Sequence, residues 1–478
     1  MRLAGRALLA FLILLSAIAT LGQAAPAASG TAEQRAARYL DSIRDNPALL
    51  EAFLRAFPKG ADLHNHLSGA VYAENYILWA AADGLCVDRK TLALSAPNPP
   101  CDEAAGRPQA SKALDDAVLY REMIDAFSMR HFSGALQSGH DHFFDTFGKF
   151  GAVSRNHVGE MVSEAAGRAA SQNVEYLELI LNLERGQATA LGAKLGWNDD
   201  FDAFRKKVDD NGAAGIVANA RKFLDSVEQH ENESRGCGRH AACWIEVRYI
   251  QEIYRGLPKE QVFAQMQVAF ELAAADPRVV AVNPVMPEDG YTSMTDFALH
   301  MRLFDYFHRL YPKVHLTLHA GELAPGLVPP EGLRNHIRDS IVLGHAERIG
   351  HGVDVMQEDR PFELLKLMRE RNVMVEINLT SNDSILGVTG MRHPLPVYLK
   401  FGVPVALSTD DEGVARSDIT HEYLRAVLAY KLSYADLKRL SRTGLEHGFL
   451  DAATKAAVRQ RLEADFATFE QQCCTARP

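Results

Sequence analysis

Histidines and a carboxylate recur in this sequence directly after short apolar stretches. His64 and His66 close the stretch that begins at Ala61, His319 closes a later one, and Asp410 follows the last. Because alternate residues of a strand point to the same face, His64 and His66 can face one point. Three imidazoles and one carboxylate suit zinc, with one position left for a water molecule whose pKa the ion would lower to about 7. The alternative for the His-x-His pair is two hydrogen-bonded histidines without a metal.

Three further polar residues stand beside these candidate ligands. Glu322 lies three residues beyond His319, His351 stands between two glycines, and Asp411 follows Asp410. His351 could orient or deprotonate the water. Asp411 is not expected to be a second equivalent ligand, because adjacent strand side chains diverge, but it could face a substrate. Structural alternatives remain for all three, namely an exposed loop acid, a structural histidine and a helix N-cap.

The apolar stretches that precede these residues are the elements that must position them. Helix-like segments separate most of the stretches, and strands that alternate with helices form parallel sheets. Eight such units predict an α/β fold of the (β/α)8 TIM barrel type, whose active sites lie at the carboxyl ends of the strands. The eight predicted strands are Ala61–Leu67, Val174–Leu181, Trp244–Ile250, Val279–Val285, Val314–Leu318, Ile341–Ile349, Val373–Leu379 and Val403–Leu407.

Segments outside this repeat have signals of their own. Thr31 with Gln34 resembles a capping box that opens a helix to about Phe57. A second helix is expected over Arg360–Arg371, with a proline in its first turn. The long stretch from Val71 to about Asn173 predicts extra helices inserted after strand 1, over one end of the barrel. The polar stretch Glu228–Arg239 is predicted to be a surface loop.

The N-terminus has the pattern of a secretory signal peptide. Arg2 and Arg6 precede an apolar run and then small residues, so cleavage is expected after Ala24 or Ala27. We therefore predict a signal peptide over residues 1–24, one catalytic domain over 31–470, and export to the periplasm or the extracellular space. An uncleaved membrane anchor is the alternative. Export permits disulfides, and two local bridges, Cys86 to Cys101 and Cys237 to Cys243, are expected, with free thiols as the alternative.

Composition limits the class of partner. The 478 residues carry a formal net charge of −10 and no run rich in Lys or Arg. A nucleic-acid polymer is therefore not an expected partner, because phosphate binding needs a basic surface. A small, nearly neutral ligand fits better, and no membrane contact is expected after signal cleavage. The oligomeric state does not follow from the sequence.

Five motifs, in order along the chain, resemble those of the adenosine deaminase family of metal-dependent hydrolases, as in an exported, bacterial-type member. They lie at or beside the ends of predicted strands and span most of the chain after the signal segment. The motifs are Pro58–Gly69, His319–Glu322, Arg348–Gly352, Thr380–Asn382 with His393–Leu395, and Leu407–Asp411.

The resemblance implies one zinc ion per chain, held by His64, His66, His319 and Asp410. Glu322 would protonate purine N1, water positioned by His351 and Asp410 would add to C6, and ammonia would leave. Asp411 would contact purine N7. Ser68 stands where better-known members carry an acid that meets the ribose 5′-hydroxyl, so it is a candidate substrate contact. The implied substrates are adenosine and 2′-deoxyadenosine.

Other functions remain open. The same barrel could deaminate adenine or a 5′-modified adenosine. Dinuclear amidohydrolases use a carboxylated lysine at the end of strand 4, but no lysine lies between Val279 and Thr292. An exported binding or signalling protein with a vestigial site is the non-enzyme alternative.

Overall fold

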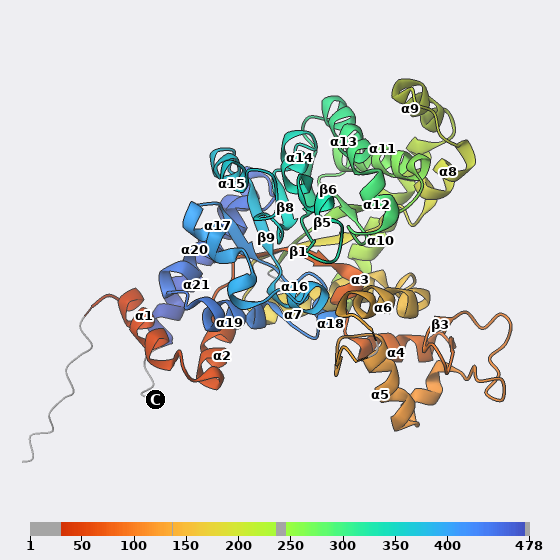
Figure 1. Cartoon of the computed structure of the whole chain (residues 1–478). Helices are drawn as coiled ribbons and strands as arrows, with labels where there is room; N and C mark the ends of the chain where they lie inside the picture. The colour runs from red at the N-terminus through yellow and green to blue at the C-terminus, as the bar shows by residue number, and fades with distance from the viewer. Residues whose placement is uncertain (1–29, 136, 236–244, 474–478) are drawn as a thin grey trace, which may run out of the picture.

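An eight-stranded parallel sheet forms the centre of the molecule (Figure 1). The computed structural model describes residues 30–135, 137–235 and 245–473. The strand order β1-β4-β5-β6-β7-β8-β9-β10 and the flanking helices confirm the predicted TIM barrel. The strands are β1 (Ala61–His66), β4 (Tyr176–Leu181), β5 (Glu246–Tyr254), β6 (Val279–Val285), β7 (His315–Ala320), β8 (Arg348–His351), β9 (Met374–Ile377) and β10 (Val405–Leu407).

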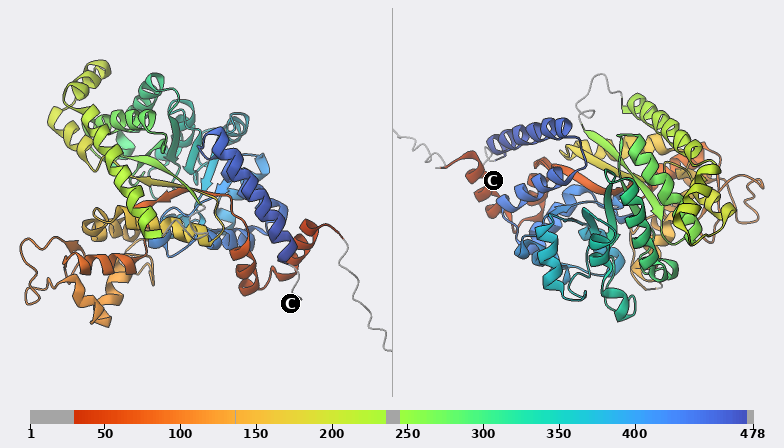
Figure 2. Two further views of the ribbon diagram at one scale, coloured as in Figure 1. Left: turned by 180° about the vertical axis from the view of Figure 1, so that it is seen from behind. Right: turned by 90° about the horizontal axis from the view of Figure 1, so that it is seen from above.

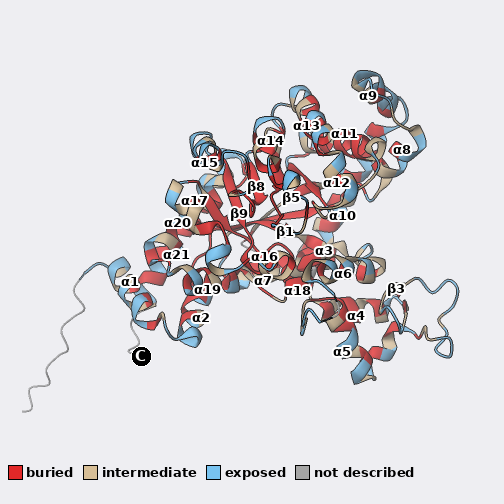
Figure 3. Cartoon of the chain, in the orientation of Figure 1, coloured by how far each residue is buried: buried red, intermediate tan, exposed pale blue. Residues whose placement is uncertain are grey.

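The strands are buried because they face the barrel interior on one side and helices on the other. Every residue of β4, β8, β9 and β10 is buried, and the strands stand out as the buried centre in Figure 3. The first and last strands meet through one isolated bridge, Asn65 with Asp410. There the Asp410 amide donates to the His64 carbonyl, and the His66 amide donates to the Asp410 carbonyl, both at 2.8 Å.

Helices surround the barrel, and most of the longer ones follow or precede a strand (Figure 2). After β4 they are α8 (Gln187–Leu195), α9 (Phe201–Asp210), α10 (Ala213–Arg235), α11 (Lys259–Ala275), α12 (Tyr291–Thr295), α13 (Phe297–Leu310), η3 (Pro330–Leu333), α14 (His336–Val342), α15 (Pro361–Glu370), α16 (Leu379–Leu386), η4 (Gly390–Arg392), α17 (Leu395–Phe401), α18 (Glu412–Ala415) and α19 (Ile419–Tyr430). No helix among the described residues has the length and apolar character that a membrane crossing requires.

The segment between β1 and β4 holds the predicted extra helices. It contains α3 (Leu67–Ala70), α4 (Ala73–Ala82), β2 (Cys86–Val87), β3 (Leu94–Ser95), η1 (Ala110–Leu114), α5 (Ala117–Ala126), α6 (Gly139–Ser154) and α7 (Val158–Ser171). Figure 1 shows α4, α5 and β3 projecting beyond the barrel. The expected disulfide between Cys86 and Cys101 is present and links β2 to the loop after β3.

The two ends of the described chain pack together. Helices α1 (Ala32–Ile43) and α2 (Pro47–Ala56) lie beside α20 (Tyr434–His447) and α21 (Ala452–Gln472), as both views in Figure 2 show. Aromatic edge-to-face contacts join Phe57 of the α2 C-cap to Tyr434 and Phe466. The predicted capping box of Thr31 is confirmed.

Several predicted boundaries are wrong. The helix from Thr31 to Phe57 is two helices, because the Asn46 side chain caps a new helix that begins with Pro47. Residues 228–235 of the predicted loop are the last two turns of α10, and 236–239 lie outside the described residues.

The predicted strands differ at their ends too. The predicted strand Ile341–Ile349 contains the end of α14 and the first residues of β8, which begins only at Arg348. The predicted strand Val373–Leu379 is too long at its end, because Leu379 is the first residue of α16. The predicted signal peptide and the cysteine pair 237 and 243 lie outside the described residues.

Candidate metal centre and substrate pocket

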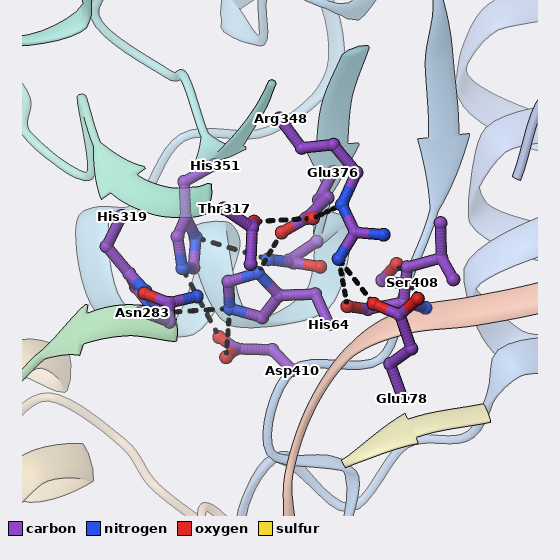
Figure 4. Close-up of polar contacts among 12 residues, drawn as sticks. His64, Glu178, Asn283, Thr317, His319, Arg348, His351, Glu376, Ser408 and Asp410 are labelled. Atoms are coloured by element: carbon purple, nitrogen blue, oxygen red, sulfur yellow. Dashed lines mark hydrogen bonds and ion pairs between the residues drawn. The ribbon is translucent and has the colours of Figure 1, made fainter. Parts of the chain in front are cut away.

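Four side chains from two strands and one loop converge inside the carboxyl end of the barrel. His64 and His66 come from β1, His319 from β7, and Asp410 from the residues just after β10. His319 Nε2 lies 3.1 Å from Nε2 of both other histidines, and Asp410 Oδ1 lies 3.4 Å from Nε2 of His64 and of His66. The structure therefore brings together all four side chains that the sequence singled out as metal ligands. Figure 4 shows three of them, His64, His319 and Asp410.

Two neighbouring side chains aim the imidazoles at this point. Glu376 Oε2 lies 2.6 Å from His64 Nδ1, and Asn283 Oδ1 lies 2.6 Å from His319 Nδ1. Since the carboxylate and the amide oxygen accept the Nδ1 protons, each Nε2 is left to present a lone pair. Glu376 is itself held by the Thr317 hydroxyl and by the buried Arg348, 2.7 Å away.

The donor set fits a divalent cation. Unprotonated Nε2 atoms 3.1 Å apart have no proton to share, so their lone pairs repel unless a positive charge lies between them. Burial lowers the pKa of His66 to about 4 and holds that of His319 well below its ordinary value, which keeps both rings neutral. Burial opposes protonation of His64, but Asp410 and Glu376 raise its pKa to about 10, so a metal ion competes there with a proton.

Glu322 and Asp411 are buried carboxyls beside the cluster. Burial, with the negative charge of Asp410, raises the pKa of both well above the ordinary range. Burial also opposes ionisation of Asp410, but His351 and His64 outweigh it and hold its pKa below the usual value. The site therefore favours the ionised form of Asp410 and the protonated forms of Glu322 and Asp411, a separation that suits acid catalysis.

His351 occupies the fourth side of the cluster. Its Nδ1 lies 3.6 Å from Glu322 Oε1, and its Nε2 lies 4.0 Å from Asp410 Oδ2. Burial lowers the pKa of His351 to about 3, so the ring is neutral. Its Nε2 and Asp411 Oδ1 are buried without hydrogen-bond partners among the described residues. Unpaired buried polar atoms are costly, and here they face a cavity in which a ligand can satisfy them.

Two motif glycines make room for these side chains. A Cβ atom at Gly350 would lie 2.6 Å from Cε1 of His64, and one at Gly69 would lie 1.6 Å from Oδ1 of Asp411. Two non-glycine residues of the site, His351 and Asp410, also adopt the left-handed backbone region, with φ angles of 69° and 60°. Asp411 also precedes α18, but its side chain makes no capping hydrogen bond.

A cavity of about 510 Å³ opens from the cluster. Helix α6 of the insertion supplies four phenyl rings to its wall, those of Phe143, Phe144, Phe147 and Phe150. The candidate substrate contact Ser68 lines the cavity, as do Glu322, His351 and Asp411. A cavity of this size, apolar in its walls and polar at a few points, suits a drug-sized ligand.

Sequence reasoning missed the residues that support the ligands. Glu376 is a lone acid within an apolar strand, and Asn283 stands beside a proline at the end of another. A buried charge within a strand needs a partner, and that signal could have indicated Glu376. Glu288 was also missed. It is buried and accepts the backbone amides of Gly321 and Glu322, which fixes the turn that carries Glu322.

Comparison with known proteins places this site in a family. The family profile described as adenosine deaminase matches residues 122–465. The chain belongs to the adenosine deaminase family. An adenosine deaminase of Escherichia coli is 40% identical over 151 residues, which are 31% of this chain and 42% of that protein. The chain thus spans less than half the length of the curated relatives it matches.

Solved structures share the fold of this family member at lower identity. A cog1816 amidohydrolase from Burkholderia ambifaria with bound Zn has a TM-score of 0.57 and 17% identity, over 90% of this chain and 96% of its own. Arabidopsis ADAL complexed with IMP has a TM-score of 0.59 and 19% identity, over 87% and 99%. An adenine deaminase from Arthrobacter aurescens has a TM-score of 0.54 and 16% identity, over 85% and 98%.

Proposed function

We propose that this protein is a zinc-dependent deaminase that converts adenosine, and 2′-deoxyadenosine, to inosine or deoxyinosine and ammonia. The observation that carries the proposal is the convergence of four metal donors with Glu322, His351 and Asp411 at one end of an aromatic cavity. Family membership supports the reaction class. Adenine and 5′-modified adenosines are the competing substrates.

The ion would be held by His64, His66, His319 and Asp410, one ion per chain. Three imidazoles and a carboxylate are typical zinc ligands, and the zinc-bound Burkholderia structure of the same fold supports this choice. When bound, zinc supplies Lewis acidity and lowers the pKa of a coordinated water to about 7.

Glu322 would act as the general acid. Burial and Asp410 raise the pKa of its carboxyl well above the ordinary value, which favours the protonated acid, and its backbone amide donates to Glu288 at 2.9 Å. A proton delivered to purine N1 draws electron density from C6, which makes that carbon accept water more readily. The displaced amine is a poor leaving group while neutral, so a proton donor near the ring is required.

Asp411 and His351 would orient the reactants. The protonated Asp411 carboxyl, unpaired at Oδ1, can donate a hydrogen bond to purine N7. His351 presents an unpaired Nε2 toward Asp410, where it can hold the attacking water in line with C6. Stacking of the purine on the rings of α6 would exclude bulk water from the reacting atoms.

We further propose that residues 1–24 are a cleaved signal peptide, that the catalytic domain covers residues 31–470, and that it works in the periplasm or outside the cell. The Cys86–Cys101 disulfide supports an oxidising compartment. Mass spectrometry of the N-terminus of protein secreted by the native host tests this, and an intact Met1 would contradict it.

The function is tested with purified protein, first by its metal content and then by ammonia release from adenosine, 2′-deoxyadenosine, adenine and AMP. We expect one zinc per chain and turnover of the two nucleosides. Zinc without ammonia release from any of them would support a binding protein with a vestigial site instead.

A further inference from the structure

The substrate cavity has a second polar region, at the ends of two strands that carry none of the ligands. The ligands come from β1, β7 and β10, whereas β4 and β5 lie between β1 and β7 in the strand order. At the carboxyl ends of β4 and β5 the cavity is lined by Asn182, Glu252 and Tyr254. Nothing in the proposed chemistry at C6 uses these three side chains.

Strand register explains why they lie together. Glu252 and Tyr254 are two residues apart on β5, so their side chains share one face. The β4–β5 register pairs Leu181 with Gln251, which places Asn182 beside Glu252 at the next position. The Tyr254 hydroxyl donates to Glu252 Oε1 at 2.5 Å. Among the described residues, Glu252 Oε2 receives no hydrogen bond.

The environment of Glu252 suits recognition of hydroxyl groups. Burial, offset in part by the Tyr254 hydrogen bond and reinforced by Glu184, raises its pKa to about 7. A carboxyl group in such a place has lone pairs that a ligand's hydroxyls can satisfy. Arg155 is the one Lys or Arg among the described residues that line the cavity, and no basic group contributes to the pKa shift of Glu252.

Purine geometry connects the two polar regions. The 6-position and N9 lie at opposite ends of the bicyclic ring, so a purine held with C6 at the ligands extends its N9 substituent across the cavity. From this we propose that Glu252, positioned by Tyr254 and flanked by Asn182, binds the sugar hydroxyls of an unphosphorylated purine nucleoside. This inference rests on the proposed function, and it makes Glu252, in place of Ser68, the main sugar contact.

The charges of the cavity favour a nucleoside over a nucleotide. Four carboxyl groups line it, those of Glu252, Glu322, Asp410 and Asp411. A phosphate placed near Glu252 would face a second acid and only the exposed Arg155 as a counter-charge. A free base would leave the hydrogen-bonding capacity of Glu252 unused. The structure therefore assigns this region to a sugar with free hydroxyls.

Substitution of Glu252 tests the assignment in the zinc-loaded, full-length protein. Glu252→Leu keeps the side-chain volume and removes the acceptor, and Tyr254→Phe removes the hydroxyl that positions it. The matched controls are Glu347→Leu, which pairs with His315 near the amino end of β8, and Tyr306→Phe, whose hydroxyl contacts Asp202. The measurements are kcat/KM for adenosine, adenine and AMP, and calorimetric affinity for inosine and hypoxanthine.

We expect Glu252→Leu to lower kcat/KM for adenosine by about 10- to 100-fold, the range for a lost hydrogen bond to a charged group. Inosine affinity should fall by a similar factor, while hypoxanthine affinity and any turnover of adenine stay unchanged. A smaller loss is expected for Tyr254→Phe, and none for the controls.

Two results would overturn the inference: an equal loss for base and nucleoside, or wild-type protein that prefers AMP to adenosine. Wild-type protein that releases ammonia from no purine would instead contradict the proposed function. In that case inosine binding, compared between wild type and Glu252→Leu, still decides whether the region binds a sugar.

Discussion

Asn382 donates a hydrogen bond from its side-chain amide to Nδ1 of His351, at 2.9 Å. The direction of this bond follows from a chain of contacts that begins at the backbone. The Leu395 amide donates to His393 Nδ1, so His393 Nε2 carries a proton and donates to Asn382 Oδ1 at 3.1 Å. Asn382 must then present its NH₂ group to His351, which leaves the proton of that ring on Nε2, facing the active site.

The tautomer of His351 can be reversed by one substitution. In Asn382→Asp, a carboxylate would accept from His351 Nδ1, and the proton would leave Nε2. We expect kcat to fall by on the order of 10²- to 10⁴-fold, as when a catalytic imidazole is held in the wrong tautomer, with zinc content unchanged. Nitrogen NMR of the imidazole reports the tautomer directly. The matched control is Asn372→Asp in an exposed turn. Normal turnover with a reversed tautomer would show that His351 does not orient the water.

Metal binding and proton donation should separate in two variants. Glu322→Gln removes the acidic proton but none of the four donors, so we expect full zinc content and a kcat lower by about 10²- to 10⁴-fold. His64→Ala removes a donor and should lose the metal together with activity. Atomic emission and an ammonia assay measure the two properties. Near-normal turnover by Glu322→Gln would eliminate it as the acid, and full zinc in His64→Ala would eliminate that ligand.

Glu376 should tune both metal affinity and stability. Glu376→Gln weakens the hydrogen bond that the side chain accepts from His64 Nδ1. Loss of such a supporting carboxylate lowers metal affinity by about 10- to 100-fold. It also removes one of the two carboxylates around the buried Arg348, so we expect the free energy of unfolding to fall by about 3 kcal/mol.

A milder variant separates charge from hydrogen bonding at Glu376. Thr317→Val removes only a hydroxyl that donates to the carboxylate and should cost about 1 kcal/mol. Chelator competition gives the zinc affinity, and urea denaturation gives the stability. If Thr317→Val and Glu376→Gln lowered the zinc affinity and the free energy of unfolding equally, the charge of Glu376 would contribute to neither.

Glu288 should make the fold sensitive to acid. Burial opposes its ionisation, but His336 and Arg255 outweigh this and lower its pKa to about 2. A carboxyl with a depressed pKa contributes stability above its unfolded value, here 4.5, and loses it as pH falls toward 2. The shift corresponds to about 3 kcal/mol.

The prediction concerns the difference between wild type and Glu288→Gln. With chelator in both samples, this difference in unfolding free energy should be largest above pH 5 and should shrink steadily as pH falls toward 3. Urea denaturation at several pH values measures it, with the exposed Glu363→Gln as control. A difference in unfolding free energy that is the same at pH 6 and pH 3 would contradict the depressed pKa of Glu288.

The barrel could be predicted because each strand is a short apolar run, and such runs alternate with amphipathic segments. The ligands could be predicted because His64, His66, His319 and Asp410 follow those runs, at the end where TIM barrels place their sites. Strand ends were less predictable. The third predicted strand ends at Ile250, whereas β5 continues through the polar Gln251 and Glu252 to Tyr254, because the end of a strand accepts polar side chains that line a cavity.

Residues that act through long-range contacts had no local signal. Glu376 and His64 are 312 positions apart and meet only because β9 and β1 belong to one closed barrel. His393 and Asn382 are only 11 positions apart and belong to motifs seen in the sequence, but their hydrogen bonds define a tautomer only in three dimensions. Contacts of this kind require the fold before they can be recognised.

The junction of β1 with the end of β10 has a consequence for biogenesis. His64, His66 and Asp410 are joined there by main-chain hydrogen bonds as well as by their proximity at the candidate ion site. A nascent chain that still lacks residue 410 has three of the four donors, and its barrel is not yet closed between β1 and the end of β10. An ion held by all four donors could therefore bind only after nearly the whole polypeptide has been synthesised. It would then link the first strand of the barrel, β1, to the end of the last, β10.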